Sequence, residues 1–139
     1  MKNGRRGSAL IEFAGSLLLL GTVFAGVFQI GYTFFAYNTL VNAVRAGARY
    51  ASLQTGRASS GNADLAKAVQ NLVVYGDLVP DAGAKSIVPG LATSNVDLTF
   101  GPATATVSVR GFKLDSVFSQ VNLDGRPAVT FPLATGAAK

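Results

Sequence analysis

The strongest constraint on this chain is an uncharged stretch that runs from Phe13 to Tyr37. A helix needs about 20 mostly apolar residues to cross the hydrocarbon core of a bilayer, and this stretch exceeds that length. We therefore expect one membrane-spanning helix over residues 13–37. Its sequence is FAGSLLLLGTVFAGVFQIGYTFFAY, and its polar interruptions are Ser16, Thr22, Gln29 and Thr33.

Charges on the N-terminal side of the stretch predict its orientation. Lys2, Arg5 and Arg6 precede it, and basic residues flanking a span favour the cytoplasmic side. The rest of the chain would then be exported. A secretory signal peptide is the competing interpretation, but its apolar core is usually about 7 to 15 residues long and ends at small residues. The longer run found here, which ends in the bulky TFFAYNTL, favours a retained anchor.

Composition narrows the range of functions. The 139 residues suffice for about one domain, and they include no cysteine and no histidine. Disulfides, thiolate zinc sites and imidazole bases are thereby excluded. The net charge of +5 includes the three basic residues near the N-terminus, and the other basic residues are scattered. A basic patch typical of nucleic-acid binding is absent from this pattern, so we expect no nucleic-acid partner.

Residue patterns that carry chemistry are also missing. No serine lies in a GxSxG elbow, and the glycines form no phosphate-binding loop. Asp77 and Asp81 are close in sequence, but they lie in a loop rich in proline and glycine, where carboxylates usually cap turns. A calcium loop needs denser oxygen ligands. We therefore expect no catalytic residues, no metal site, no cofactor and no enzyme activity.

Helical character continues beyond the apolar stretch, to about residue 54. Ala43, Gly47 and Ala51 recur every four residues and form a stripe of small side chains on one helix face. Such stripes let another backbone approach closely, so we assign these three residues to helix packing. Arg45 and Arg49 form a second stripe, which we expect to face water or acidic partners.

The remaining sequence predicts a small α+β domain. After the Gly/Ser-rich break at 55–62, Asn62 could cap a helix over Ala63–Tyr75 that ends at Gly76, and a loop covers 77–90. Alternating apolar residues then predict an antiparallel hairpin, formed by NVDLTF (95–100) and TATVSV (104–109). AVTFPL (128–133) is expected as a third strand with Pro132 at its end or on an edge. Between them, helical spacing predicts a short helical turn containing Leu114, Val117, Phe118 and Val121.

Glu12 is unusual because it is a carboxylate at the edge of the apolar stretch. Two interpretations stay open. The carboxylate could lie at the level of the lipid headgroups, where its cost is small. Alternatively, it needs a positive partner, and a new α-amino group at Ser8, released by a cut after Gly7, would be one.

The block RRGSALIEFA, directly before a long apolar run, resembles the leader of a type IV prepilin. Most type IV pilins carry Phe after the leader glycine, and the Ser8 found here makes the block more similar to the TadE-like pilins of tight-adherence (Tad/Flp) pilus systems. VRAGARYA, at residues 44–51, is a second motif typical of that family. The resemblance implies cleavage by a prepilin peptidase after Gly7, with Ser8 as the first mature residue and Glu12 as the fifth.

The resemblance also implies a division of the chain and a role. Residues 1–7 would be the leader, 8–54 a transmembrane and spine helix like that of type IV pilins, and 55–139 the exported domain. The chain would be a minor pilin or pseudopilin in the bacterial inner membrane, destined after processing for a pilus that acts in adhesion or secretion. Its partners would be the prepilin peptidase, other pilin subunits, the assembly machinery and the lipid bilayer.

Several alternatives remain open at this point. The resemblance does not decide between a place in the fibre, a priming role and a place at the base. An uncleaved single-pass scaffold of a secretion machine is one competing function, and a membrane-tethered binding domain is another.

Overall fold

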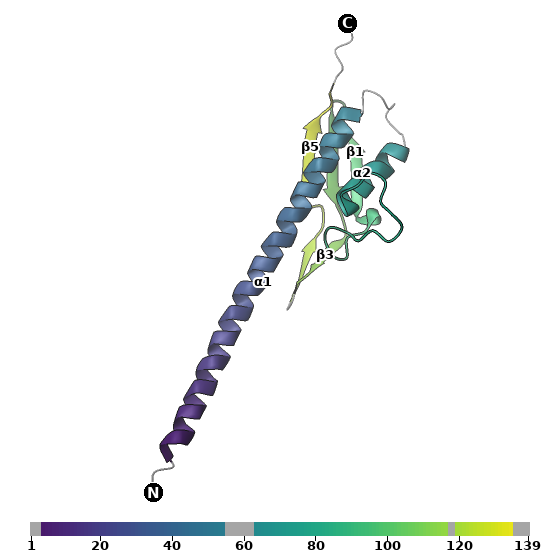
Figure 1. The fold of residues 1–139 in the computed structure, drawn as a ribbon. Coiled ribbons are helices and arrows are strands. Elements are labelled where there is room, and N and C mark those ends of the chain that lie inside the picture. The colour runs from purple at the N-terminus through teal and green to yellow at the C-terminus, as the bar shows by residue number, and fades with distance from the viewer. Residues whose placement is uncertain (1–3, 55–62, 117–118, 135–139) are drawn as a thin grey trace.

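The computed structural model describes residues 4–54, 63–116 and 119–134. Its main element is α1 (Gly4–Gln54), a single helix of 51 residues that is about 76 Å long at 1.5 Å per residue. All the other elements lie beside its C-terminal half, and the N-terminal half extends away from them (Figure 1). The fold is thus a long helix with a small α+β unit at one end, as the sequence predicts.

The second helix, α2 (Ala63–Tyr75), has the predicted bounds. Its buried side chains are Val69, Val73 and Val74. The helix stops at Gly76, whose φ of 77° lies in the left-handed region that glycine adopts without strain. The predicted cap, Asn62, lies outside the described residues.

A three-stranded antiparallel sheet has the order β1–β2–β5, formed by β1 (Val96–Phe100), β2 (Thr104–Val109) and β5 (Ala128–Pro132). The predicted hairpin and third strand are therefore confirmed, and a short 3-10 turn, η1 (Thr93–Asn95), leads into the first strand. Pro132 ends β5 on an edge of the sheet, where the missing N–H of proline breaks no ladder. Ala105, Val107 and Val109 of the central strand are fully buried.

The short helical turn predicted between β2 and β5 is wrong. Residues there form a second, two-stranded antiparallel sheet, β3 (Phe112–Asp115) and β4 (Gln120–Leu123), in which Leu114 pairs with Val121. The helical spacing of the apolar residues suggested a helix, but Phe112 and Leu114 are buried while Lys113 and Asp115 are exposed. That alternation is the period of a strand, and it began two residues before the segment used for the prediction. Val117 and Phe118 lie outside the described residues.

The hydrophobic core joins the second half of α1 to both sheets and to α2. Leu40, Val44 and Ala48 of α1 are fully buried. The residue that follows β5 by two positions is bound to the same helix, because the N–H of Ala134 donates to the carbonyl oxygen of Ser52 at 3.1 Å. Residues 32–54 of α1 are thus a structural part of the α+β unit, whereas residues 7–31 are exposed apart from the half-buried Ala25 and Gln29.

Candidate assembly surface of the N-terminal helix

Residues 7–31 of α1, here called the uncovered segment, carry almost no protein contacts. Every residue in it is exposed except Ala25 and Gln29, which are half-buried. Soluble proteins rarely expose a continuous apolar surface of this size, which usually marks a membrane or protein interface. Within the described part of the chain, α1 is the one helix long and apolar enough to cross a membrane. Its large exposed side chains include Leu10, Leu17, Leu18, Phe24 and Phe28.

The proposed processing residues lie at the start of this segment. Gly7 and Ser8 are helical and exposed, and a Cβ atom on Gly7 would have no neighbour within 4 Å. No contact in the described structure therefore requires glycine at position 7.

Glu12 is also exposed, one helical turn after Ser8. Among the described side chains it has no ion pair, because the salt bridge found there joins Arg110 to Asp97 at 3.2 Å. Long helical side chains lean toward the N-terminus, so helix geometry predicts the Glu12 carboxylate over the turn that begins at Ser8. An amino group at Ser8 would therefore be within reach of this carboxylate.

The predicted stripe of small residues lies outside the uncovered segment, in the half of α1 that the α+β unit covers. Ala43, Gly47 and Ala51 are all buried in the covered half of α1. At Gly47 the neighbour is α2 of the same chain, because a Cβ atom on Gly47 would lie 2.5 Å from Cγ2 of Val73 and 3.4 Å from Cγ1 of Val69. The close approach that the small side chain permits is thus used inside the fold. The arginines of the neighbouring stripe, Arg45 and Arg49, are exposed.

Small residues also form a shallow hollow on the uncovered segment. It is lined by Leu18, Gly21, Thr22, Ala25 and Gly26, and nothing lies within 4 Å of a Cβ atom built on either glycine. Small side chains at helical spacing allow a second helix to approach closely within a membrane. This hollow was not singled out from the sequence, although the spacing of Gly21, Ala25 and Gly26 could have indicated it.

Two hydrogen bonds fasten the β3–β4 hairpin to α1 at the border of the uncovered segment. Gln29 Nε2 donates to Ser119 Oγ at 3.0 Å, and the hydroxyls of Thr33 and Ser116 are 2.9 Å apart. Sequence reasoning noted Gln29 and Thr33 only as polar interruptions. Their spacing of four residues, which puts both on one helix face, was the signal for a polar partner.

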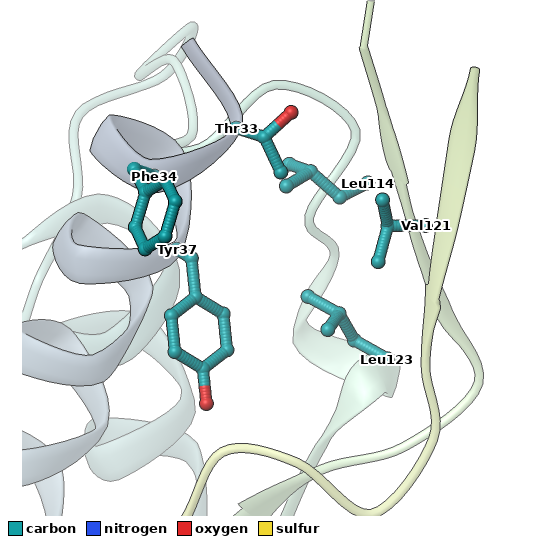
Figure 2. A pocket seen from close by; sticks show the side chains of 6 residues that line it. All are labelled: Thr33, Phe34, Tyr37, Leu114, Val121 and Leu123. Carbon is teal, nitrogen blue, oxygen red and sulfur yellow. The ribbon is translucent and has the colours of Figure 1, made fainter. Parts of the chain in front are cut away.

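An apolar cavity of about 240 Å³ lies between α1 and the same hairpin. Figure 2 shows the rings of Phe34 and Tyr37 on one side and the side chains of Leu114, Val121 and Leu123 on the other. Its lining offers no charged group and no acid–base pair.

Among the described residues, no group of three or more His, Cys, Asp or Glu side chains could hold a metal ion. Asp77 accepts a hydrogen bond from the N–H of Val79 at 3.3 Å, as a residue that caps a turn does.

Comparison with known proteins identifies the helical segment. Residues 7–49 match the family model described as TadE-like protein. No curated protein and no solved structure matches the chain. The match covers the glycine and glutamate of the first motif and most of the second motif, and it ends within α1. This chain therefore carries a TadE-like N-terminal helix, which confirms the family resemblance seen in its sequence.

Proposed function

We propose that this chain is a TadE-like minor pilin or pseudopilin that acts in the biogenesis of Tad/Flp-type pili. The observation that carries the proposal is the uncovered segment of α1, an apolar and mostly exposed helix that lies inside the TadE-like match. The TadE-like family associates the chain with Tad pilus systems. The chain would act by non-covalent packing, through its helix, against the corresponding helices of other subunits.

The proposed topology is a single pass through the bacterial inner membrane. Lys2, Arg5 and Arg6 would remain in the cytoplasm, in line with the positive-inside rule, and the α+β unit would be exported. A prepilin peptidase would then cut between Gly7 and Ser8. The exposure of both residues supports access by such an enzyme, because no element of the described fold covers them.

The surface for subunit contacts is proposed on the uncovered segment and not on the Ala43–Gly47–Ala51 stripe. That stripe is buried, with Gly47 against α2. Leu18, Gly21 and Gly26, around the shallow hollow, remain accessible for a second helix. In hydrocarbon, packing of small residues is a main source of helix association.

Reporter fusions and subunit capture test this proposal together. A phosphatase that works only outside the cytoplasm, fused after Lys139, is expected to be active, and a reporter that works only in the cytoplasm is expected to be inactive. Other pilus subunits are expected to co-purify with the membrane-extracted chain. An inactive phosphatase, or a chain that brings down no pilus component, would contradict the proposed function.

A further inference from the structure

We propose that two copies of this chain pack side by side through their α+β units, with the acidic loop at 77–81 of one copy in a basic groove of the next. The inference rests on the proposed function, because it takes the chain to work in an assembly of subunits. It adds a contact outside the apolar part of α1 to the one proposed on the uncovered segment.

The basic groove lies between α1 and the segment that begins β5. It has a volume of about 390 Å³, and its lining comes from these two elements: Tyr37, Val41, Arg45 and residues 125–129. Arg45 and Arg126 are exposed, whereas Val41 and Val129 are half-buried. The groove therefore combines two cationic side chains with apolar surface.

The positive charge of the basic groove is not neutralised by the chain itself. All seven carboxylate side chains belong to the described residues, and the salt bridge found among those residues involves neither Arg45 nor Arg126. Asp124, the carboxylate nearest to Arg126 in sequence, accepts a hydrogen bond from the N–H of Gly111 at 3.2 Å. Both guanidinium groups thus remain available to carboxylates of another chain.

The acidic loop after α2 has the complementary composition. Residues 77–81, DLVPD, carry an exposed aspartate at each end, and Val79 between them is 82% exposed. Hydrogen bonds hold the backbone, since Asn71 Nδ2 donates to the carbonyl oxygen of Leu78 at 3.2 Å and the N–H of Val79 donates to Asp77 Oδ1 at 3.3 Å. The loop thus offers two carboxylates and one apolar side chain to a groove with two cations and apolar surface.

The two surfaces lie on opposite faces of α1, near the same level of the helix. On the loop side, the N–H of Ile87 donates to the carbonyl oxygen of Val74 at the end of α2, and Ile87 lines one hollow together with Thr39. Val41, in the groove, lies two residues after Thr39 and is therefore rotated by about 200° around the helix. Figure 1 shows α2 and β5 on opposite sides of α1.

This placement suits subunits that stand next to one another in a membrane. A contact between two different surfaces is heterologous and can be repeated from copy to copy. Because the surfaces lie near one level of α1, the helices of neighbouring copies can cross the bilayer at similar depth. Exposed ion pairs contribute little by themselves, so we expect the charges to select which surfaces meet and Val79 to add apolar burial.

Cysteine cross-linking tests the contact, because the chain has no native cysteine. Two full-length chains with different tags, one with Val79→Cys and one with Ala128→Cys, are produced together and treated in intact cells with a short bis-maleimide. Both positions are exposed. We expect a cross-linked pair that carries both tags, and a ladder of larger products when one chain carries both cysteines. Lys113→Cys, exposed on β3, replaces Ala128→Cys as the control for random collision.

Charge reversal then tests the recognition. Asp77→Lys with Asp81→Lys in the Val79→Cys chain, or Arg45→Glu with Arg126→Glu in the Ala128→Cys chain, is expected to lower the cross-linked fraction several-fold, because like charges then face each other. Combining the two reversed chains should restore the cross-link. Reversal of the exposed Asp64 on α2 to lysine is the matched control and should change nothing.

The outcomes separate this contact from the proposed function. Absence of the cross-link while other pilus subunits still co-purify would overturn the contact and leave the proposed function intact. Reversals that lower co-purification of other subunits, without any cross-link between copies, would assign the groove to a different subunit and also overturn the contact. A cross-link that the single reversals do not lower, or that the combined reversal does not restore, would likewise contradict it.

Discussion

Gly47 of α1 lies so close to Val73 of α2 that a Cβ atom on Gly47 would be 2.5 Å from Cγ2 of the valine. This contact joins the long helix to the α+β unit. Real Cβ atoms do not approach other carbons so closely, so a larger residue at position 47 must push the two helices apart. Both residues are buried, which leaves little room for a shift.

Gly47→Ala is therefore expected to lower the free energy of unfolding by up to about 2 kcal/mol, because overpacking costs about 1–3 kcal/mol and the gain in helix propensity is about 1 kcal/mol. Thermal unfolding of the full chain in detergent measures the change. Combining it with Val73→Ala, which removes the clashing methyl groups, should give a smaller loss than the sum of the single variants. Additive losses would show that the two side chains do not interact.

Substitutions of glycines in the uncovered segment should affect association with other subunits and not the stability of the fold. A Cβ atom on Gly21 or Gly26 meets nothing, so Gly21→Leu and Gly26→Leu should leave the unfolding temperature unchanged. Both would fill the shallow hollow and reduce recovery of the chain with other pilus subunits. Pull-down from membranes at equal protein levels measures this effect. Ile30→Leu, also on the uncovered segment, is the control that keeps size and apolarity. Equal recovery of other pilus subunits with all three variants would contradict a role of the hollow in subunit contacts.

Truncation should separate the two halves of α1. A chain of residues 32–139 keeps Leu40, Val44 and Ala48, and we expect it to be folded and soluble in the absence of detergent. A chain of residues 55–139 loses all three, and we expect it to be unfolded, because losing a large buried side chain such as that of Leu40 alone costs about 2–5 kcal/mol. Circular dichroism and amide dispersion in NMR spectra measure the difference. A folded 55–139 chain would show that the α+β unit does not need α1 for its stability.

Replacing Glu12 should affect assembly and insertion differently. Glu12→Gln removes the charge but keeps size and hydrogen bonding. We expect it to weaken subunit association roughly tenfold, or about 1.4 kcal/mol. That loss is a fraction of the attraction of about 4 kcal/mol between unit charges about 4 Å apart at an effective dielectric of 20. Glu12→Leu should insert at least as well as the native chain, since an unpaired carboxylate disfavours lipid. Piliation and co-purification, compared at equal levels of mature protein, provide the measurement. Normal association of Glu12→Gln would leave Glu12 as a carboxylate at the headgroup level.

The sequence predicted the regular elements well because their patterns are local. The uncharged stretch indicated the long helix, Gly76 marked the end of α2, and alternation from Val96 onward indicated the β1–β2 hairpin. The error at Leu114 and Val121 arose because four apolar residues fit the helical period by chance. Pairing between two strands is a contact across the chain, and a window of eight residues does not contain that information.

The candidate surface was predicted only in part. Spacing showed that Ala43, Gly47 and Ala51 share a face, but it could not show which backbone lies against that face. The contact of Gly47 with Val73 depends on how α2 folds back onto α1. The bond between Gln29 and Ser119 joins residues far apart in sequence, so it follows from the tertiary structure alone.

Cleavage at Gly7 is the central claim of the proposed function. Gly7 is exposed and without neighbours in the described structure, so replacing it by phenylalanine should leave the fold intact and block only processing. Gly21→Phe, equally free of neighbours, is the matched control for the added ring. We expect the Gly7→Phe chain to persist at full length and the Gly21→Phe chain to be processed normally.

The most direct measurement is the N-terminal residue of the native protein, extracted from membranes of cells with an active prepilin peptidase and read by mass spectrometry. The account predicts a chain that begins at Ser8. A chain that still begins at Met1 or Lys2 would contradict it.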